Sequence, residues 1–298
     1  MAKQRAALNG KVVAITGGAQ GIGKATATAL VRKGCRVAIG DIDLALAEKT
    51  AAGLGGGTVA LPLDVTDRAS FTSFVDEAER QLGPLDVLIN NAGIMPVTAL
   101  VDESDDSIKR QLDINVYGVI VGTQLAIERM RPRASGHIVN IASQAGKTSI
   151  PGIATYSGTK HAVVGVCEAV KAELRKTGVE VHCVMPTVVN TDLTAGLSQK
   201  LIKPVEVEDV ANEIVDSLEV GRFDVYVPRS NAVMTRFSAL LPRRASEAIG
   251  RLMKADKLMF EVDHGARRAY EERAAASEPG LGEKPDAATE ATPQRDAA

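Results

Sequence analysis

Seven short apolar runs, separated by longer segments, occupy most of this chain and limit what it can fold into. Nearly every position in these runs is apolar, which is typical of parallel strands covered on both faces. The segments between them have the apolar spacing of helices, and strand–helix alternation predicts right-handed β–α–β units. We therefore predict an α/β fold built on a single doubly wound parallel sheet of about seven strands, with helices on both faces. The runs are residues 12–17, 36–41, 58–64, 86–93, 136–143, 179–186 and 223–228.

Two of the helical segments have recognisable ends. Residues 67–83 begin at Asp67, a predicted N-cap, and end at Gly83, a predicted C-cap. Residues 150–178 have the pattern of a second helix, which is expected to begin near Ala154.

The chain divides into three parts by composition. Residues 8–230 contain all seven runs and no fixed-period repeat, so we predict one domain there. Residues 231–273 are helical in composition, although Pro242 interrupts the pattern, and we predict a C-terminal helical extension. Residues 274–298 are rich in Ala, Pro and Glu and have no cluster of large apolar residues. They cannot bury enough surface to offset chain entropy, so we predict a disordered tail.

Charge and composition exclude several kinds of site. The net charge is −2 and no basic run is interleaved with aromatic residues, so we expect no nucleic-acid partner. The four histidines lack metal-ligand spacing, so we expect no metal. Cys35, Cys167 and Cys183 lack C-x-x-C spacing and are expected to be buried free thiols. The N-terminus has no apolar leader region, and a cytoplasmic protein is expected.

A glycine-rich turn follows the first run and opens a helix. Its sequence is TGGAQGIG, with glycines at Gly17, Gly21 and Gly23. Glycines let the backbone turn tightly and let a pyrophosphate approach the helix N-terminus, where unpaired N–H groups favour an anion. Any tight strand–helix turn can contain glycines, so the motif alone is weak evidence for a dinucleotide site. Its place in the first β–α–β unit makes that evidence strong.

An acidic residue ends the second run. Asp41 lies eighteen positions after Gly23, where a carboxylate can accept hydrogen bonds from both hydroxyls of an adenosine ribose. The same carboxylate would repel a 2′-phosphate, and Gln20 stands in the turn where a basic residue would be needed. The pattern favours NAD over NADP; the alternative is that Asp41 only caps a helix.

Tyr156 and Lys160 form a Y-x-x-x-K pattern in the stretch YSGTK. Residues four apart share one face of a helix. A phenol has a pKa near ~10, and a neighbouring ammonium favours the phenolate, which would bring proton transfer within reach of neutral pH. Alone, the pattern also fits a packed ring beside a surface lysine. Neighbouring residues favour the catalytic interpretation. Ser143 and the NNAG stretch at 90–93 end two other runs, at the edge where open α/β sheets bind ligands.

These motifs together resemble the short-chain dehydrogenase/reductase family, in its single-domain branch. The resemblance covers residues 8–228 and rests on TGGAQGIG, NNAG, IAS and YSGTK, in that order. It implies a Rossmann-type, NAD-binding catalytic domain in which Tyr156 is the acid/base and Ser143 orients the substrate oxygen. Lys160 would lower the pKa of Tyr156 and bind the nicotinamide ribose. Asn115 would hold a water that extends the proton path from Lys160. Taken singly, Ser143 could merely cap a turn and Asn115 could merely bond to backbone.

The resemblance also implies a set of cofactor contacts. Asp64 and Val65 would lie at the adenine ring, Asn91 beside the adenosine ribose, and Val189 and Thr191 at the nicotinamide carboxamide. With the glycine turn, the predicted cofactor-binding residues are Gly17, Gln20, Gly21, Ile22, Gly23, Asp41, Asp64, Val65, Asn91, Ala92, Gly93, Tyr156, Lys160, Val189 and Thr191.

The sequence departs from the family at Thr187, which follows Pro186 where the family usually has glycine. If Thr187 cannot take the backbone angles of a glycine, the local turn differs. A different turn would change the shape of the pocket wall formed by this loop more than it would change the chemistry of the site.

The loops on the substrate side are mostly apolar. Lys147 is the only charge in residues 144–152, and no arginine clamp for a carboxylate or phosphate is evident. We therefore predict a hydrophobic secondary alcohol or its ketone, of steroid- or terpenoid-like character. The predicted substrate-binding residues are Ser143, Ile94, Met95, Leu193 and Leu197, with Val97 as a further candidate.

Residues 235–254 combine five basic residues with an apolar stripe and a single acid, Glu247. The pattern fits an element on an anionic membrane surface, a lid on the substrate loop, or a subunit contact. Membrane association is therefore an alternative to a purely cytoplasmic location.

Together these features predict an NAD-dependent oxidoreductase that interconverts a hydrophobic secondary alcohol and its ketone. The resemblance implies a homodimer or homotetramer that forms through the helices carrying Asn115 and Tyr156. Two alternatives stay open. A non-catalytic NAD-binding scaffold would be expected to lack Tyr156, Lys160 or Ser143. A sugar-nucleotide epimerase would be expected to have a different glycine spacing and a sizeable substrate lobe.

Overall fold

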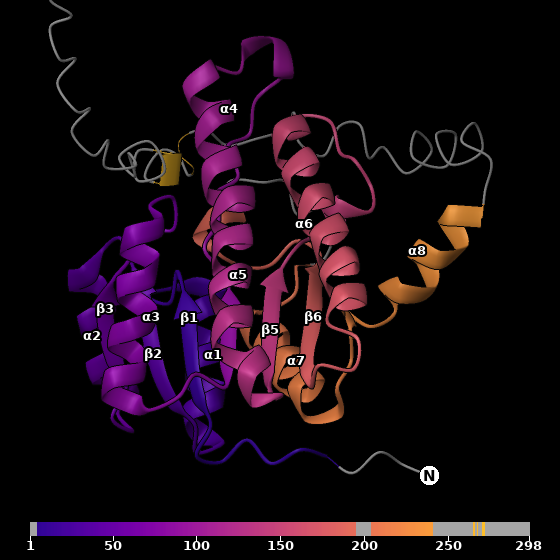
Figure 1. Cartoon of the computed structure of the whole chain (residues 1–298). Coiled ribbons are helices and arrows are strands. Elements are labelled where there is room, and N and C mark those ends of the chain that lie inside the picture. The colour runs from indigo at the N-terminus through magenta and orange to yellow at the C-terminus, as the bar shows by residue number, and fades with distance from the viewer. Residues whose placement is uncertain (1–4, 195–203, 241–264, 266, 268–269, 272–298) are drawn as a thin grey trace, which may run out of the picture.

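The computed structural model describes residues 5–194, 204–240, 265, 267, 270 and 271 (Figure 1). Its centre is one seven-stranded sheet in which all neighbouring strands are parallel, in the order β3-β2-β1-β4-β5-β6-β7. Each strand lies within one of the seven apolar runs, so the predicted fold is confirmed. The strands are β1 (Val12–Thr16), β2 (Arg36–Asp41), β3 (Val59–Pro62), β4 (Val87–Asn90), β5 (Gly136–Ile141), β6 (Val179–Pro186) and β7 (Asp224–Val227).

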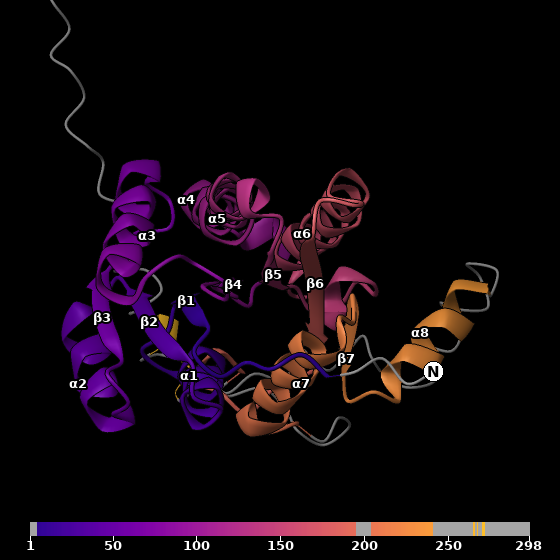
Figure 2. The ribbon, with the colours of Figure 1, turned by 60° about the horizontal axis from the view of Figure 1, so that its bottom comes forward.

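Helices cover both faces of the sheet, as Figures 1 and 2 show. One face carries α1 (Gly21–Arg32), α2 (Leu44–Leu54) and α7 (Val207–Val220). The other carries α3 (Arg68–Leu82), α6 (Ala154–Glu173) and a long interrupted helix. In that helix, α4 (Asp105–Leu112) passes through the π-helical turn η2 (Asp113–Tyr117) into α5 (Gly118–Met130). The remaining elements are η1 (Leu100–Asp102), η3 (Arg131–Arg133), η4 (Gln144–Gly146), η5 (Asp192–Thr194) and α8 (Asn231–Leu240).

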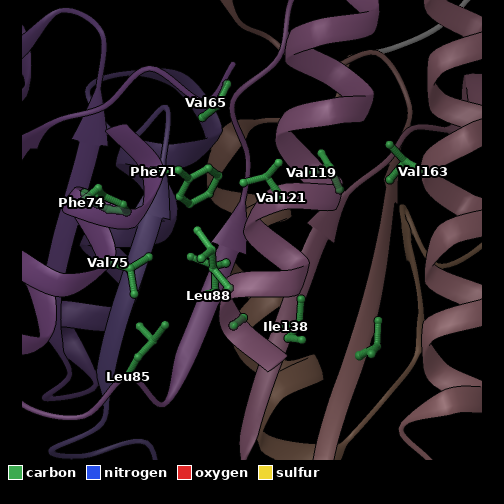
Figure 3. Close-up of a cluster of buried hydrophobic side chains, with 14 of the residues drawn as sticks. Val65, Phe71, Phe74, Val75, Leu85, Leu88, Val119, Val121, Ile138 and Val163 are labelled. Carbon is green, nitrogen blue, oxygen red and sulfur yellow. The ribbon is translucent and has the colours of Figure 1, made fainter. Parts of the chain in front are cut away.

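Alternate residues of each strand enter two separate hydrophobic cores. In β1, Val12 and Ala14 belong to the core beneath α3, α5 and α6, and Val13 and Ile15 to the core beneath α1, α2 and α7. Figure 3 shows the first core, including Phe71 of α3. Successive side chains of a strand point to opposite faces. Strands buried on both faces must therefore be apolar at every position, which explains the uninterrupted runs.

The three predicted helix boundaries are confirmed. The side chain of Asp67 accepts a hydrogen bond from the N–H of Ala69 at the start of α3, and Gly83 is its C-cap with φ of 97°. Helix α6 begins at Ala154.

The order of the strands reverses at β1, because β2 and β3 lie on one side of it and β4 to β7 on the other. Ligands of open α/β sheets bind at such a switch point, beyond the carboxyl ends of the strands. Strand β4 ends at Asn90, earlier than predicted. The hydroxyl of Thr16 accepts hydrogen bonds from the N–H groups of Asn91 and Ala92, both at 3.0 Å. These bonds take the chain out of the sheet and beside the glycine turn.

Only part of the predicted C-terminal extension falls within the described residues. Helix α8 projects from the body of the domain (Figures 1 and 2), with Val233 and Phe237 exposed. The side chain of Gln144 donates a hydrogen bond to the hydroxyl of Thr235 at 2.6 Å, which ties α8 to η4. Residues 241–254 of the basic segment and the predicted tail at 274–298 lie outside the described residues. The division at 230 and 273 therefore stays a prediction.

Two further expectations can be compared with the structure. The three cysteines are buried and free, as predicted. No helix in the described part of the chain combines the length and the apolar character needed to cross a bilayer.

Candidate active site

A cavity of about 670 Å³ lies beyond the carboxyl ends of the strands, where the loops after β1 and β4 meet. Fourteen of the fifteen predicted cofactor-binding residues line it, the exception being Gly23. Ile94, Met95, Ser143 and Leu193 of the predicted substrate set also line it. Leu197 lies outside the described residues. The structure thus brings together nearly all residues that the motifs singled out.

Two glycines of the turn occupy positions with no room for a side chain. Gly17 has φ of +63°, and a Cβ there would lie 2.9 Å from the Cα of Ala92. A Cβ at Gly23 would lie 2.2 Å from the carbonyl oxygen of Gly17. Gln20 is the N-cap of α1 and makes no side-chain capping bond, and the first turn of α1 contains no acid. The cradle therefore presents helix N–H groups to the cavity, which suits the pyrophosphate of a dinucleotide.

Asn91 holds the glycine turn in place. Its side-chain nitrogen donates to the carbonyl oxygens of Thr16 and Gly17, each at 2.9 Å. Asp64, across the cavity, accepts hydrogen bonds from the N–H and the hydroxyl of Thr66, at 2.8 and 2.7 Å. Both residues line the cavity as predicted, and both also fix the loops on which they lie.

Asp41 lies at the end of β2, with its carboxylate beside the glycine turn. One carboxylate oxygen accepts from the N–H of Ala19 at 3.1 Å and the other from the N–H of Asp43 at 3.2 Å. The N-cap of α2 is Asp43, whose side chain accepts from Leu46, so the alternative of Asp41 as a helix cap is wrong. Burial raises the pKa of Asp41, while the two backbone hydrogen bonds lower it.

Tyr156 lies in the first turn of α6, with its buried side chain in the cavity wall. Ser143 lines the same cavity, and its side chain is near enough to Tyr156 to affect the pKa of the phenol. The Ser143 oxygen accepts from the N–H of Ala145 at 3.1 Å, as the N-cap of η4. Ser143 therefore caps a turn, as one alternative proposed, and also lies near Tyr156.

Lys160 lies one helical turn after Tyr156 and is also buried. Its Nζ donates to the carbonyl oxygen of Ile141 at 2.8 Å and lies 5.6 Å from the centre of the Tyr156 ring. Burial lowers the pKa of Lys160 to about 8. The i, i+4 spacing thus places the two side chains together, as expected.

The pKa of Tyr156 corrects one expectation. Burial raises the pKa of Tyr156 to about 12; the neighbouring Ser143 side chain lowers it and the nearby Tyr270 raises it further. The predicted lowering by Lys160 does not dominate in this structure. The physical reason is that a buried phenolate loses its hydration, and the ammonium that would stabilise it is itself desolvated.

Asn115 lies in the π-helical turn η2 and is fully buried. Its side-chain oxygen accepts from the N–H of Ile94 at 2.9 Å, and its nitrogen donates to the Ile94 carbonyl at 2.9 Å and to the Thr159 hydroxyl at 3.2 Å. These bonds clamp the start of the substrate loop to α6, and they agree with the alternative in which Asn115 bonds to backbone. The water-mediated role stays a prediction. Single π-turns inside α-helices are frequent at functional sites.

The substrate side of Tyr156 is apolar. Tyr156 forms a small buried cluster with Met95, Val97, Ala145 and Ile153. Lys147, the one charge expected in this region, pairs with Glu168 at 2.9 Å. The apolar character predicted for this side of the site is present in the structure.

Two residues of the C-terminal extension reach the site, although no sequence motif indicates them. Tyr270 lines the cavity, and its hydroxyl accepts from the N–H of Met95 at 2.8 Å. Arg267 is fully buried and donates to the carbonyl oxygens of Met95 and Leu193. The only local signal is the i, i+4 spacing of Arg267 and Glu271, which indicates a helix but no distant partner.

Thr187 occupies its position without a glycine-like backbone. Among the described non-glycine residues, only Ala134 and Lys176 have positive φ. The N–H of Thr187 donates to the carbonyl oxygen of Val227 at 3.0 Å, and the loop beyond it still places Val189 and Thr191 at the cavity.

His137, Glu180 and His182 gather at the amino ends of β5 and β6, with side-chain nitrogen and oxygen atoms within 4.8 Å of one another. The Nδ1 of His182 lies 2.8 Å from the carbonyl oxygen of Arg222, and its Nε2 lies 3.1 Å from the Nδ1 of His137. If His182 donates to Arg222 and His137 donates to His182, hydrogen bonds explain both spacings. We assign this cluster a structural role.

Known proteins similar to this chain share its motifs and fold. A family model described as short chain dehydrogenase matches residues 11–202. The 17-beta-hydroxysteroid dehydrogenase 13 of Rattus norvegicus is 30% identical over 271 residues, which is 89% of each chain. The sorbitol dehydrogenase of Cereibacter sphaeroides is 38% identical over 194 residues, 65% of this chain and 76% of that protein. A short chain dehydrogenase/reductase from Burkholderia phymatum, crystallised in complex with NAD, superposes with a TM-score of 0.73 at 25% identity, covering 78% of this chain and 94% of that one.

The matched residues include the glycine turn, NNAG and the Tyr156–Lys160 pair, and they extend over more than half of the chain. The same residues form the wall of the cavity at the switch point of the sheet. The chain therefore belongs to the short-chain dehydrogenase/reductase family of oxidoreductases.

Proposed function

We propose that this protein is an NAD-dependent dehydrogenase and ketone reductase that interconverts a hydrophobic secondary alcohol and its ketone. One observation carries the proposal. Tyr156 and Ser143 line one cavity together with a polar cradle made by the glycine turn and Asp41, and Tyr156 packs in an apolar cluster with Met95 and its neighbours. A nicotinamide and an apolar alcohol would meet at the Tyr156 hydroxyl.

The residues of the site divide the work of proton transfer. When bound, the nicotinamide ring accepts a hydride from the alcohol carbon or donates one to the ketone carbon. Ser143 hydrogen-bonds to the substrate oxygen and aligns it with Tyr156. In oxidation, Tyr156 as phenolate takes the hydroxyl proton; in reduction, the phenol returns it. Lys160, when protonated, favours the phenolate by its charge and binds the nicotinamide ribose.

The choice of NAD rests on Asp41 and Gln20. A half-buried carboxylate at the adenosine end of the cavity would accept hydrogen bonds from ribose hydroxyls and repel a 2′-phosphate. Gln20 provides no cation to offset that repulsion. The Burkholderia phymatum structure, a relative in complex with NAD, supports the same choice.

The apolar cluster around Tyr156 supports a large apolar substrate, and similarity to a hydroxysteroid dehydrogenase agrees with it. Similarity to a sorbitol dehydrogenase makes a polyol the second candidate. The two candidates differ in the groups that the pocket must bury, because a polyol would leave several hydroxyls without partners against Met95, Ala145 and Ile153. We therefore favour the apolar alcohol.

The proposal is tested with a panel of steroid and terpenoid alcohols and sorbitol, each with NAD and NADP, followed at the nicotinamide absorbance. We expect apolar alcohols with NAD to have the highest kcat/KM. Replacing Tyr156→Phe removes the proton carrier and keeps the ring, and should lower kcat by about 10²- to 10⁴-fold. The exposed Tyr117→Phe is the matched control.

Three results would count against the proposal. Unchanged turnover in Tyr156→Phe would exclude the mechanism. Faster oxidation of sorbitol than of any apolar alcohol would exclude the substrate class. Binding of NAD without turnover of any alcohol or ketone would favour the non-catalytic scaffold instead.

A further inference from the structure

Arg267 and Tyr270, here called the C-terminal anchor, hold one residue of the substrate loop from both sides. The N–H of Met95 donates to the Tyr270 hydroxyl at 2.8 Å, and the carbonyl of the same residue accepts from Arg267. Met95 is buried in the apolar cluster that contains Tyr156. The anchor thus pairs both main-chain polar groups of a buried loop residue, as a neighbouring strand would in a sheet.

Arg267 also connects this loop to the second substrate loop. Its guanidinium donates to the carbonyl oxygen of Leu193 at 2.9 Å and to the carboxylate of Glu271 at 3.1 Å. The Arg267 side chain is 0% exposed, and its guanidinium carbon lies 4.9 Å from the centre of the Tyr270 ring. A buried guanidinium is costly unless its donors are paired. Here the pairing requires the loops after β4 and β6 to be at a set separation.

Tyr270 itself forms part of the pocket. It lines the cavity together with Met95, Leu193 and Tyr156, and only 9% of it is exposed. Its presence beside Tyr156 adds to the upward shift of the Tyr156 pKa. An apolar alcohol whose hydroxyl lies at Tyr156 would extend along the same wall and contact the Tyr270 ring.

The near end of the extension contacts a third loop. Thr235 of α8 accepts a hydrogen bond from Gln144, which follows Ser143. Described residues of the extension therefore contact the loops after β4, β5 and β6, which carry Met95, Ser143 and Leu193 of the predicted substrate set. The glycine turn and Asp41 of the dinucleotide cradle lie elsewhere, after β1 and at the end of β2.

We propose that Tyr270 is a specificity-determining residue of the alcohol pocket and that Arg267 is the positioning residue that seats it. The inference rests on the proposed function, because it assigns this half of the cavity to an alcohol. The ligand class is an apolar secondary alcohol that packs on the Tyr270 ring while its hydroxyl meets Tyr156.

Kinetics of the full-length protein test the specificity role. Arg267→Met keeps the length of the side chain but removes the donors, and Tyr270→Ala removes the wall. Both should raise the KM for an apolar alcohol by about tenfold or more, while the Kd for NADH, measured by fluorescence without alcohol, stays within about twofold. Tyr270→Ala should also raise the ratio of kcat/KM for a bulky alcohol over that for a small one. Tyr270→Phe keeps the wall and should keep that ratio.

Hydrogen exchange tests the anchor without any turnover. In cofactor-free protein, the amide of Met95 should exchange about tenfold faster or more in Arg267→Met and Tyr270→Phe, because both weaken the docking that protects it. Arg32→Met, at an exposed residue of α1, is the matched control and should leave exchange and KM unchanged.

Two results would overturn the inference. One is an unchanged alcohol KM together with unchanged Met95 exchange in the anchor variants. The other is an equal loss of NADH binding and alcohol binding, which would indicate damage to the whole fold. Failure of the proposed function can be distinguished from failure of this inference, because the wild-type protein would then oxidise no alcohol. That result would exclude the specificity role of Tyr270, and the exchange response would remain as evidence for the anchor alone.

Discussion

Tyr156 and Lys160 lie one helical turn apart, and burial shifts their pKa values in opposite directions. The pKa of Tyr156 is raised to about 12 and that of Lys160 is lowered to about 8. Both shifts disfavour the charged form of the residue, because a buried charge loses its hydration. A phenolate at Tyr156 is therefore most stable when Lys160 is protonated, so the two groups titrate as a pair.

This pairing predicts an asymmetric pH dependence. Each alcohol oxidised releases one proton, so the ratio of the forward to the reverse kcat/KM must rise tenfold per pH unit. Because the raised pKa keeps Tyr156 protonated near neutral pH, its phenolate fraction rises tenfold per pH unit while its phenol fraction stays near one. Between about pH 6 and about pH 8, kcat/KM for oxidation should rise with pH and that for ketone reduction should stay flat. Initial rates at saturating nicotinamide cofactor in both directions measure this.

The variant Lys160→Met sharpens the same test. Without the ammonium, the pKa of Tyr156 should rise further, which lowers the phenolate fraction used in oxidation and makes the phenol a weaker acid in reduction. Both directions should therefore fall at a fixed pH, by up to about tenfold for each added pKa unit, because a variant cannot change the equilibrium constant of the reaction. A pH dependence carried equally by both directions would contradict the assignment of Tyr156 as the titrating acid/base.

The carboxylate of Asp41 is expected to determine the preference for NAD over NADP. Replacing Asp41→Ser removes the carboxylate that would face the adenosine ribose. The ratio of kcat/KM with NAD to kcat/KM with NADP should then fall by about tenfold or more, because loss of about 1.4 kcal/mol of discrimination corresponds to a factor of ten. Acid should act in the same direction in the wild type, because burial raises the pKa of Asp41 and protonation removes the repulsion of a 2′-phosphate. An unchanged ratio in Asp41→Ser would remove the argument for NAD.

At the scale of elements, helix α5 lies unusually close to strand β4. A Cβ at Gly122 would lie 2.2 Å from the side-chain oxygen of Asn90 and 2.5 Å from the ring of Phe71, and both side chains are buried. Asn90 directly precedes Asn91, which holds the glycine turn. Close packing of this helix therefore supports the position of the cofactor cradle.

Gly122→Ala should lower the free energy of unfolding by about 1 to 3 kcal/mol, because overpacking forces the helix away from the sheet. Gly165→Ala is the matched control, since a Cβ at this exposed position of α6 would meet no atom within 4 Å. That change should raise the free energy of unfolding by about 0.5 to 1 kcal/mol, the usual difference between alanine and glycine in a helix. Urea denaturation measures both, and changes of the same sign would contradict the packing argument.

The elements could be predicted from the sequence where their signals are local. Uninterrupted apolar runs predicted every strand in the described part of the chain, and Asp67 and Gly83 predicted both ends of α3. The π-helical turn at Asn115 had no such signal, because its side chain is held by Ile94 and Thr159, which lie in other elements.

The same reasoning explains which part of the site could be predicted. The glycine turn, Asp41, and the Tyr156–Lys160 pair are short motifs, and the parallel sheet brings their loops to one edge. Arg267 and Met95 are 172 residues apart in the chain, and neither has a motif that indicates the other. The pKa of Tyr156 was predicted in the wrong direction because the extent of burial is a property of the folded site.

At the scale of the whole molecule, one surface lies apart from the cavity wall and the two cores. On the helix that continues from α4 into α5, Leu112 is 47% and Tyr117 is 44% exposed. Large apolar side chains on one exposed helix are typical of surfaces that associate. The same helix carries Asn115, and the family resemblance implies subunit contacts through it.

We expect a homo-oligomer that forms through this helix, with Leu112→Glu as the test. Light scattering after size exclusion should give the wild type at least twice the chain mass of 31.3 kDa. In a two-fold interface, each substitution places two buried charges in one contact, so Leu112→Glu should reduce the mass to that of one chain. Val233→Glu, on the projecting helix α8, is the control and should keep the wild-type mass. A monomeric wild type would contradict the prediction, and equal dissociation by both substitutions would place the contact elsewhere.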